Sequence, residues 1–220
     1  MGNTTKQIAN HGIKKVGFAE IISGTDGAMS YGDIQWLKGF TQIDPGQLKS
    51  GDPIFADNGV YLKGRVNLGQ EVEGTATTYQ LKQDETTFKK VAFGKIDDGN
   101  GGSYDDPSAR QNFALVYIEP ITREGLPDDE QITYIYNVSV KDDATRETKT
   151  DTANNQYVEY KFTFSHTLSE FTKGLDGKYM RMFTLTKSEA DDARYEAAQK
   201  TVAVPTAKTT NAGTSTNTGN

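Results

Sequence analysis

The chain alternates apolar and polar residues over long stretches, and this pattern constrains it to β-structure. Successive side chains of a strand point to opposite faces, so a period of two predicts a strand with one buried and one polar face. Residues 60–78 show the longest alternation and predict one long strand or a hairpin of two. Their apolar set is Val60, Leu62, Val66, Leu68, Val72 and Ala76, and their polar set is Lys63, Arg65, Asn67, Glu71, Glu73 and Thr75.

Turn and bend residues accompany this stretch. Asp57, Asn58 and Gly59 precede it, and they are typical of a tight turn, because Asp and Asn bind local backbone amides and Gly tolerates positive φ. Glycine then recurs every five residues, at Gly59, Gly64, Gly69 and Gly74. Glycine inside a strand usually marks a bulge or a bend. We therefore expect this ribbon to bend or to project beyond its own domain.

Further segments with the same period predict more strands. IKKVGFAEII and IQWLKGFTQI, near the start, each predict one strand. NFALVYIEPI is apolar on both faces and predicts a central strand that ends at Pro120, where the missing amide interrupts the ladder. KYMRMFTLT follows the turn residues Asp176 and Gly177, so we expect it to form a hairpin with the preceding strand, YVEYKFTFSHTL.

Two of these segments also predict which residues are buried. QITYIYNVSV places one set on its apolar face, namely Ile132, Tyr134, Tyr136, Val138 and Val140, and another on its polar face, namely Thr133, Asn137 and Ser139. YVEYKFTFSHTL places Val158, Tyr160, Phe162 and Phe164 inside, and Tyr157, Glu159, Lys161, Thr163 and Ser165 outside. The expected fold is mainly β, with a core of aromatic and β-branched residues.

One short α-helix is predicted to flank this sheet, over residues 84–93. Asp84 can cap the segment ETTFKKVAF, and Gly94 can end the helix. Phe88, Val91 and Ala92 share one face at helical spacing, so this face should pack on the sheet.

The C-terminal part has a different character. SEADDARYEAAQK begins with Ser188, has Asp191 at the capping-box position, and predicts a solvated helix without an apolar face to dock it. Beyond Val204 the chain is a low-complexity tail of Thr, Asn, Gly, Ala and Ser. We therefore divide the chain into an N-terminal arm of residues 1–12, a β domain of residues 13–187, and an extension of residues 188–220.

Composition excludes several classes of function. The 220 residues, of which 35% are hydrophobic, suffice for one domain with a single core. A formal net charge of -6 argues against sequence-independent binding of nucleic acid, which requires a cationic face. The absence of cysteine excludes disulfides and a thiolate nucleophile. We expect no membrane span, because no run approaches about 20 apolar residues, and no secretory signal, because MGNTTKQIANHG lacks an apolar region.

No segment carries a catalytic or cofactor-binding pattern, so we predict no catalytic, cofactor or metal site and no enzyme activity. The densest set of oxygen ligands is DDGNGGSYDD, from Asp97 to Asp106. An EF-hand loop starting at Asp98 needs an acid where Ala109 stands, so a turn-rich loop between helix and central strand is the favoured interpretation. Whether this loop binds a cation stays open.

The remaining polar candidates have no partners in the sequence. His11 and His166 lack a nucleophile or ligand set nearby, so a structural role is favoured for both. A glycosidase would need two carboxylates about 5–9 Å apart, which sequence alone cannot place. The acids available for such a pair are Glu71, Glu73, Glu119, Glu159 and Glu170.

The order of segments resembles one known family. IQWLKGFTQID, a Gly-rich gap and PIFADNGVY are similar to the N-terminal half of major tail proteins from long-tailed phages of Gram-positive bacteria. The similarity continues through VEGTATTYQL, KKVAFG, the Asp/Gly loop, FALVYIEP and ITYIYNVSV, over about residues 13–185. Phe55 stands where many relatives carry Tyr, and the tail past Ser188 has no counterpart in the resemblance.

This resemblance implies a tail-tube subunit with a β-sandwich or barrel fold. It implies six copies per ring and stacked rings that form a hollow tube around a tape-measure protein, with terminator and baseplate proteins at the ends and DNA passing through. The location would be the virion tail, after synthesis in the host bacterial cytoplasm. A carbohydrate-binding β-sandwich of an adhesion or cell-surface protein is the alternative, favoured by eleven tyrosines and a Thr-rich tail. Residues that face the lumen cannot be assigned from sequence.

Overall fold

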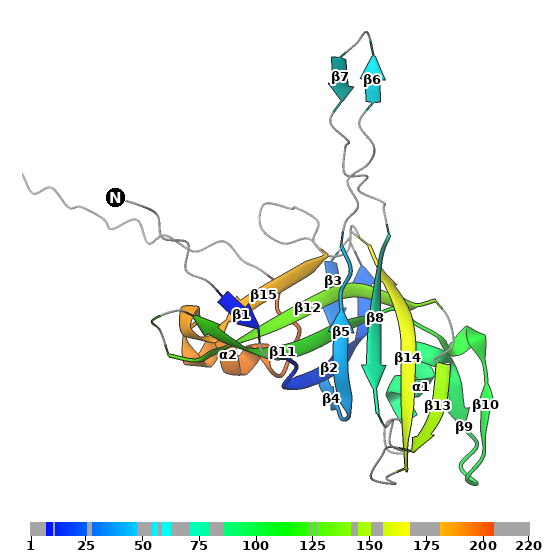
Figure 1. Ribbon diagram of the computed structural model, residues 1–220. Coiled ribbons are helices and arrows are strands. Elements are labelled where there is room, and N and C mark those ends of the chain that lie inside the picture. The colour runs from blue at the N-terminus through cyan, green and yellow to red at the C-terminus, as the bar shows by residue number, and fades with distance from the viewer. Residues whose placement is uncertain are drawn as a thin grey trace, which may run out of the picture.

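The structure is a computed structural model, and it describes residues 8–10, 12–25, 28–47, 54–56, 59–62, 71–79, 86–123, 125, 127–141, 145–150, 156–167 and 181–204. The fold is mainly β, as predicted. Eleven strands form one antiparallel sheet, shown in Figure 1, whose main path is β3-β2-β11-β12-β14-β8-β5. Its strands are β1 (Ile8–Asn10), β2 (Lys15–Thr25), β3 (Ala28–Tyr31), β4 (Gln35–Leu37), β5 (Phe40–Asp44), β8 (Val72–Thr78), β11 (Phe113–Arg123), β12 (Asp129–Val140), β13 (Thr145–Thr150), β14 (Gln156–His166) and β15 (Met182–Thr186).

Smaller elements surround this sheet. Two α-helices are described, α1 (Thr86–Phe93) and α2 (Asp192–Ala198), with 3-10 turns η1 (Pro107–Ala109) and η3 (Lys187–Glu189). Two hairpins form sheets of their own, β6 (Ile54–Ala56) with β7 (Gly59–Leu62), and β9 (Lys95–Asp97) with β10 (Ser103–Asp105). The β6–β7 hairpin lies apart from the large sheet, at the top of Figure 1.

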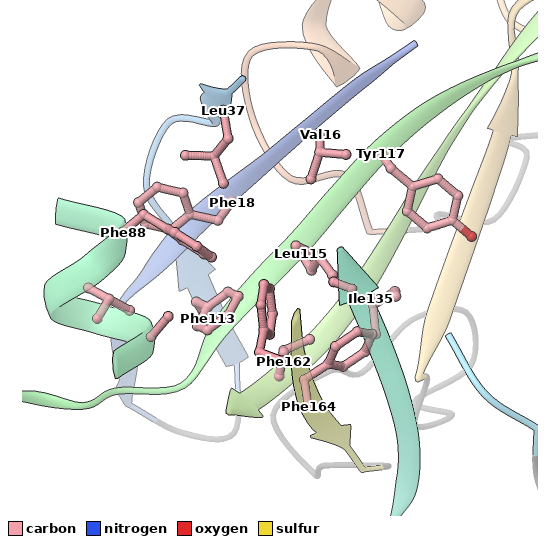
Figure 2. Packing of buried hydrophobic residues seen from close by; sticks show 14 of the residues in the cluster. Val16, Phe18, Leu37, Phe88, Phe113, Leu115, Tyr117, Ile135, Phe162 and Phe164 are labelled. Carbon is pink, nitrogen blue, oxygen red and sulfur yellow. The ribbon is translucent and has the colours of Figure 1, made fainter. Parts of the chain in front are cut away.

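Both faces of the central strands are buried, because β11 presents alternate residues to two cores. On one face Phe113, Leu115 and Tyr117 join the α1-side core, which contains α1 and the inner faces of β8 and β14 (Figure 2). On the other face Ala114 and Val116 join the α2-side core, which contains residues of α2. The prediction that this segment is a doubly buried central strand is confirmed.

The helix α1 confirms the sequence prediction. Phe88, Val91 and Ala92 are buried, and Gly94, at φ +68°, ends the helix with a bond from its amide to the Lys90 carbonyl at 2.9 Å. A left-handed residue after the last turn is the usual way for a helix to end. The predicted cap, Asp84, lies outside the described residues.

The strand β11 does not end at Pro120, as predicted, but continues to Arg123. On one edge it pairs with β2 up to Ile118 and with β1 from Ile121. Pro120 lies between these two partners, so its missing amide falls where the neighbouring strand changes. The ladder therefore passes the proline without losing a bond to either strand.

A bulge in β12 reverses the faces predicted for this strand. Phe113 pairs with Val138 and Leu115 with Ile135, so β12 has one extra residue between these pairs. Asn137 lies there at φ +50°, a left-handed conformation that asparagine tolerates. The prediction of one apolar face is therefore wrong: Ile132, Tyr134 and Tyr136 lie in the α2-side core, whereas Val138 and Val140 lie in or against the α1-side core.

Several strand pairings also differ from the predictions. The segment IQWLKGFTQI forms two strands, because the chain turns at Gly39, φ +86°, and β4 pairs with β2 while β5 pairs with β8. The strand β15 is not the hairpin partner of β14, since it pairs with β12 from Ile135 to Gln131. The turn residues Asp176 and Gly177 lie outside the described residues.

The alternating residues 60–78 contribute to two different sheets. β7 pairs with β6, whereas β8 pairs with β14 and β5, so neither a single strand nor a hairpin of this stretch is found in the described residues. The alternation itself is confirmed in β8, where Val72 and Ala76 are buried and Glu73 and Thr75 are exposed. The predictions for residues 63–70, which include Gly64, Val66, Leu68 and Gly69, lie outside the described residues.

Gly74 marks a close contact and not the predicted bulge. β8 pairs with β14 in an unbroken register across it. A Cβ atom at Gly74 would lie 2.4 Å from Phe164 Cζ and 2.6 Å from the Asp44 carbonyl oxygen. Only a residue without Cβ allows the Phe164 ring and the β5 backbone to approach this closely. Asp57 and Asn58, the predicted turn between β6 and β7, lie outside the described residues.

The helix α2 docks on the sheet, contrary to the prediction of a solvated helix. It begins at Asp192 because the Asp191 side chain, not that of Ser188, accepts a bond from the Arg194 amide. Tyr195 and Ala198 are each 3% exposed and pack in the α2-side core. One aromatic and one small residue thus suffice to bury one side of a short helix. The division into arm, β domain and extension stays a prediction.

Candidate assembly surface

The acidic segment from Asp97 to Asp106 uses its carboxylates to build its own turn. It forms the β9–β10 hairpin and the start of η1. Asp98 Oδ1 accepts bonds from the amides of Asn100 at 2.8 Å and Gly102 at 2.9 Å, and these bonds lower the pKa of Asp98. In the part of the chain that the structure describes, no group of three acidic or histidine side chains is arranged to hold a metal ion.

The described histidine is a buried structural residue. His166 is 2% exposed, and its Nε2 lies 2.8 Å from the Pro45 carbonyl oxygen, where it serves as donor. Burial lowers the pKa of His166, and the nearby Arg181 lowers it further. This geometry ties the end of β14 to the residues after β5. His11 lies outside the described residues.

The described candidate carboxylates are engaged in contacts with neighbouring side chains, and Glu71 and Glu73 share one lysine. Glu71 and Glu73 bind Lys141 Nζ at 2.6 and 2.9 Å, and Glu119 accepts a bond from Gln131. Glu159 is 6% exposed and lies 2.8 Å from Lys161 Nζ, so the prediction that it lies outside is wrong. The fifth candidate, Glu170, lies outside the described residues.

Two other residues assigned to polar faces, Ser165 and Thr133, are buried, and each pairs with a hydroxyl group of a neighbouring strand. Ser165 Oγ lies 2.9 Å from Ser139 Oγ between β14 and β12, and Thr133 Oγ1 lies 3.0 Å from Thr184 Oγ1 between β12 and β15. Hydroxyl pairs of this kind satisfy buried polar groups across a sheet. Sequence reasoning missed them because each partner strand was unknown.

A four-stranded section of the sheet has the geometry of a joining surface. The strands β5, β8, β14 and β13 lie side by side in this order, as Figure 1 shows. β5 pairs with β8 and β13 pairs with β14, and within the described ranges neither has a second neighbour. An open edge presents backbone donors and acceptors to any strand that can approach. This section therefore has one free edge at each side.

The outer face of this section is polar. The inner face carries Ala76, Phe162 and Phe164 of the α1-side core. The outer face forms a shallow hollow, and its side chains are Gln42, Thr75, Thr77, Thr145, Lys161 and Thr163. Such a polar face can remain exposed to solvent while the edge strands pair with strands of another subunit. We call β5, β8, β14 and β13 the open-edged section.

The described aromatic residues do not form a sugar-binding platform. Tyr117, Tyr134, Tyr136 and Tyr195 are buried in the two cores. Tyr79 and Tyr104, 42% and 55% exposed, belong to different elements. Stacking of a sugar needs neighbouring exposed rings, so the buried tyrosines are better explained by packing. Within the described ranges, no helix has the length and apolar character that crossing a lipid bilayer requires.

Comparison with protein families identifies the class of this chain. Residues 3–212 match the family described as phage tail tube protein. The chain belongs to the phage tail tube protein family. No curated protein and no solved structure matches the chain.

Membership in the tail tube family confirms the resemblance seen in the sequence. It makes this chain a structural protein of the bacteriophage virion, located in the tail, that self-associates into a tube. A structural family of this kind is not a class of enzymes. The match also reaches residue 212, so it includes most of the residues past Ser188, for which the resemblance had offered no counterpart.

Proposed function

We propose that six copies of this chain close into a ring by joining their open-edged sections. The β5 edge of one subunit pairs with the β13 edge of the next, so the sections form a continuous barrel around a central channel. Closing a sheet on itself removes its edges, which otherwise invite uncontrolled pairing. The observation that carries this proposal is the open-edged section itself, with a buried inner face, a polar outer face and a free edge on each side.

Rings of this kind stack into the tail tube and form the conduit for DNA ejection. The polar outer face of the open-edged section then lines the channel. A net charge of -6 per copy disfavours adhesion of DNA, so DNA passes without specific binding. A tape-measure protein occupies the channel during assembly, terminator and baseplate proteins bind the tube ends, and the subunits are made in the host bacterial cytoplasm.

Electron microscopy of the purified protein tests this proposal. Negative staining should show sixfold rings or hollow tubes. Particles that stay monomeric at all concentrations, or rings of another symmetry, would contradict it.

A substitution in β5 tests which edge closes the ring. Thr41 lies at a register shift between Phe40 and Gln42 and has no register partner on β8, although its Oγ1 donates a bond to the Thr77 carbonyl at 3.4 Å. Proline is tolerated at bulges and edges, so Thr41→Pro removes one amide of the edge strand at a position without a register partner on β8. We expect a folded subunit that no longer assembles, measured by light scattering after size exclusion. Thr41→Ala, which keeps the amide, should assemble like the parent; equal assembly of both variants would exclude the β5 edge.

A further inference from the structure

A fork in the sheet places one arginine between two diverging strands. β12 pairs with β15 up to Ile135 and with β14 from Val138. Arg181 immediately precedes β15, and its carbonyl accepts a bond from the Tyr136 amide at 2.9 Å. His166, the last residue of β14, pairs with Val138. Arg181 therefore lies where β14 and β15 separate from β12.

The guanidinium of Arg181 is buried with most of its hydrogen-bonding capacity unused. The residue is 7% exposed. Its Nη1 donates one long bond, 3.5 Å, to the His166 carbonyl oxygen, while Nε and Nη2 are buried without a partner. Nε and Nη2 lie on one edge of the planar guanidinium, and this edge binds a carboxylate side-on through two parallel bonds. The structure thus contains an empty fork shaped for a carboxylate.

The described residues around the fork supply no counter-charge. His166 Nε2 is occupied by the Pro45 carbonyl, and its buried Nδ1 has no partner. An imidazole is either neutral or cationic, so His166 provides no negative charge to the guanidinium. A buried charge without a partner destabilises a fold, and natural proteins almost always pair it. Among the described residues, the isolated subunit therefore supplies no acceptor to Nε and Nη2 of Arg181.

We propose that the Arg181 fork is a receptor for an acidic side chain of a second copy of this chain, which fills it during assembly. This inference rests on the proposed self-assembly of the subunit. Each copy carries 30 acidic and 24 basic residues, so neighbouring copies bring a surplus of carboxylates. Arg181 is 7% exposed in the subunit, so the entering carboxylate has to displace the atoms that cover the guanidinium. Filling the fork then favours the assembled form over the free subunit.

The variant Arg181→Met tests this proposal. The proposal predicts that this substitution stabilises the isolated subunit but weakens its assembly into tubes. Met fills a similar volume without charge. In dilute protein, where light scattering shows monomers, the thermal midpoint should rise by about 4 °C or more, because an uncompensated buried charge is removed. The concentration at which tubes form should rise at least about tenfold, because a charged pair is lost from the interface. Arg194→Met, at an exposed arginine of α2, should change neither quantity.

Each other outcome overturns the proposal in a distinguishable way. A lower midpoint for Arg181→Met would mean that an acceptor from the same chain fills the fork. A higher midpoint with parent-like assembly would exclude a second copy as the source. Protection of the parent but not of Arg181→Met by duplex DNA would assign the fork to phosphate. If the parent protein never assembles, the proposed function fails as well. The thermal midpoints of the parent and of Arg181→Met still report in that case whether the fork lacks a partner in the subunit. Arg181→Lys, which keeps charge without the fork, should retain the low midpoint and assemble poorly.

Discussion

Replacing Phe88 by alanine should detach α1 from the sheet at a large cost in stability. Phe88 is fully buried, at 0% exposed, and lies beside Phe18 where α1 meets the sheet in Figure 2. Its ring centroid lies 5.1–6.3 Å from those of five other rings, Phe18, Phe40, Phe93, Phe113 and Phe162. Three of these contacts are edge-to-face, the geometry that aromatic rings prefer.

The magnitude follows from this packing. Removal of a buried Phe side chain usually costs about 3–5 kcal/mol, and contacts to five rings place Phe88→Ala near 5 kcal/mol. For a chain of this length, that corresponds to a drop in melting temperature of roughly 10–20 °C. Phe88→Leu keeps much of the volume and should cost about 1.5 kcal/mol. Tyr104→Ala, at a 55% exposed ring, should change the free energy of unfolding by less than about 0.5 kcal/mol.

Urea unfolding followed by tryptophan fluorescence measures these differences. Trp36 is the one tryptophan of the sequence and packs against the α2-side core, away from the substituted site. The measurements belong at concentrations where the subunit is monomeric, because assembly stabilises the folded form by mass action. A cost below about 2 kcal/mol for Phe88→Ala, or one equal to that of Tyr104→Ala, would refute the view that α1 is held by this ring cluster.

Three further predictions address single contacts. Gly74→Ala should destabilise the subunit by about 2 kcal/mol or more in thermal unfolding, because the new Cβ would lie 2.4 Å from Phe164 Cζ; an unchanged melting curve would contradict this. Asp191→Ala should cost about 1 kcal/mol by removing the cap of α2, whereas Asp191→Asn, which can still cap, should cost less; equal losses would show that the cap is not the cause. The pKa of His166 is lowered in the fold from its ordinary value of 6.5, so the unfolded chain binds this proton more readily, and stability should fall as the pH falls below that value. His166→Gln should flatten this part of the stability profile relative to the parent, as urea titrations between pH 5 and 8 would measure, and an unaltered profile would contradict the assignment.

Side-chain alternation was the reliable signal in this sequence. It predicted the faces of β8, while a run that is apolar on both faces predicted the doubly buried β11 and helical spacing predicted the buried face of α1, because in each case the backbone keeps a regular period over the whole element. Where one residue interrupts the period, prediction failed. Asn137 is a polar residue within an alternating run, and nothing in the sequence distinguishes it from an ordinary outward-facing residue. Its left-handed φ nevertheless exchanges the faces of everything after it in β12.

Pairing between strands that are distant in the sequence was the second feature that the sequence did not predict. Two strands joined by a short turn usually pair as a hairpin, and this expectation placed β15 next to β14. The structure places β15 on β12 instead, since Tyr134 and Phe183 stack with centroids 6.1 Å apart. The docking of α2 depends in the same way on contacts that alternation does not encode, such as the bond from Tyr134 Oη to the Ala198 carbonyl at 2.5 Å.

Two of the wrong predictions, the faces of β12 and the partner of β15, concern the same place in the fold. The bulge at Asn137 separates the part of β12 that pairs with β15 from the part that pairs with β14. Because of the bulge, Tyr134 and Tyr136 before it lie in the α2-side core, whereas Val138 after it lies in the α1-side core, where the strand leads into the open-edged section. The Arg181 fork lies at this junction. Any movement that opens the fork would therefore shift the open-edged section relative to the rest of the sheet, and this couples the filling of the fork to the edges through which subunits are proposed to join.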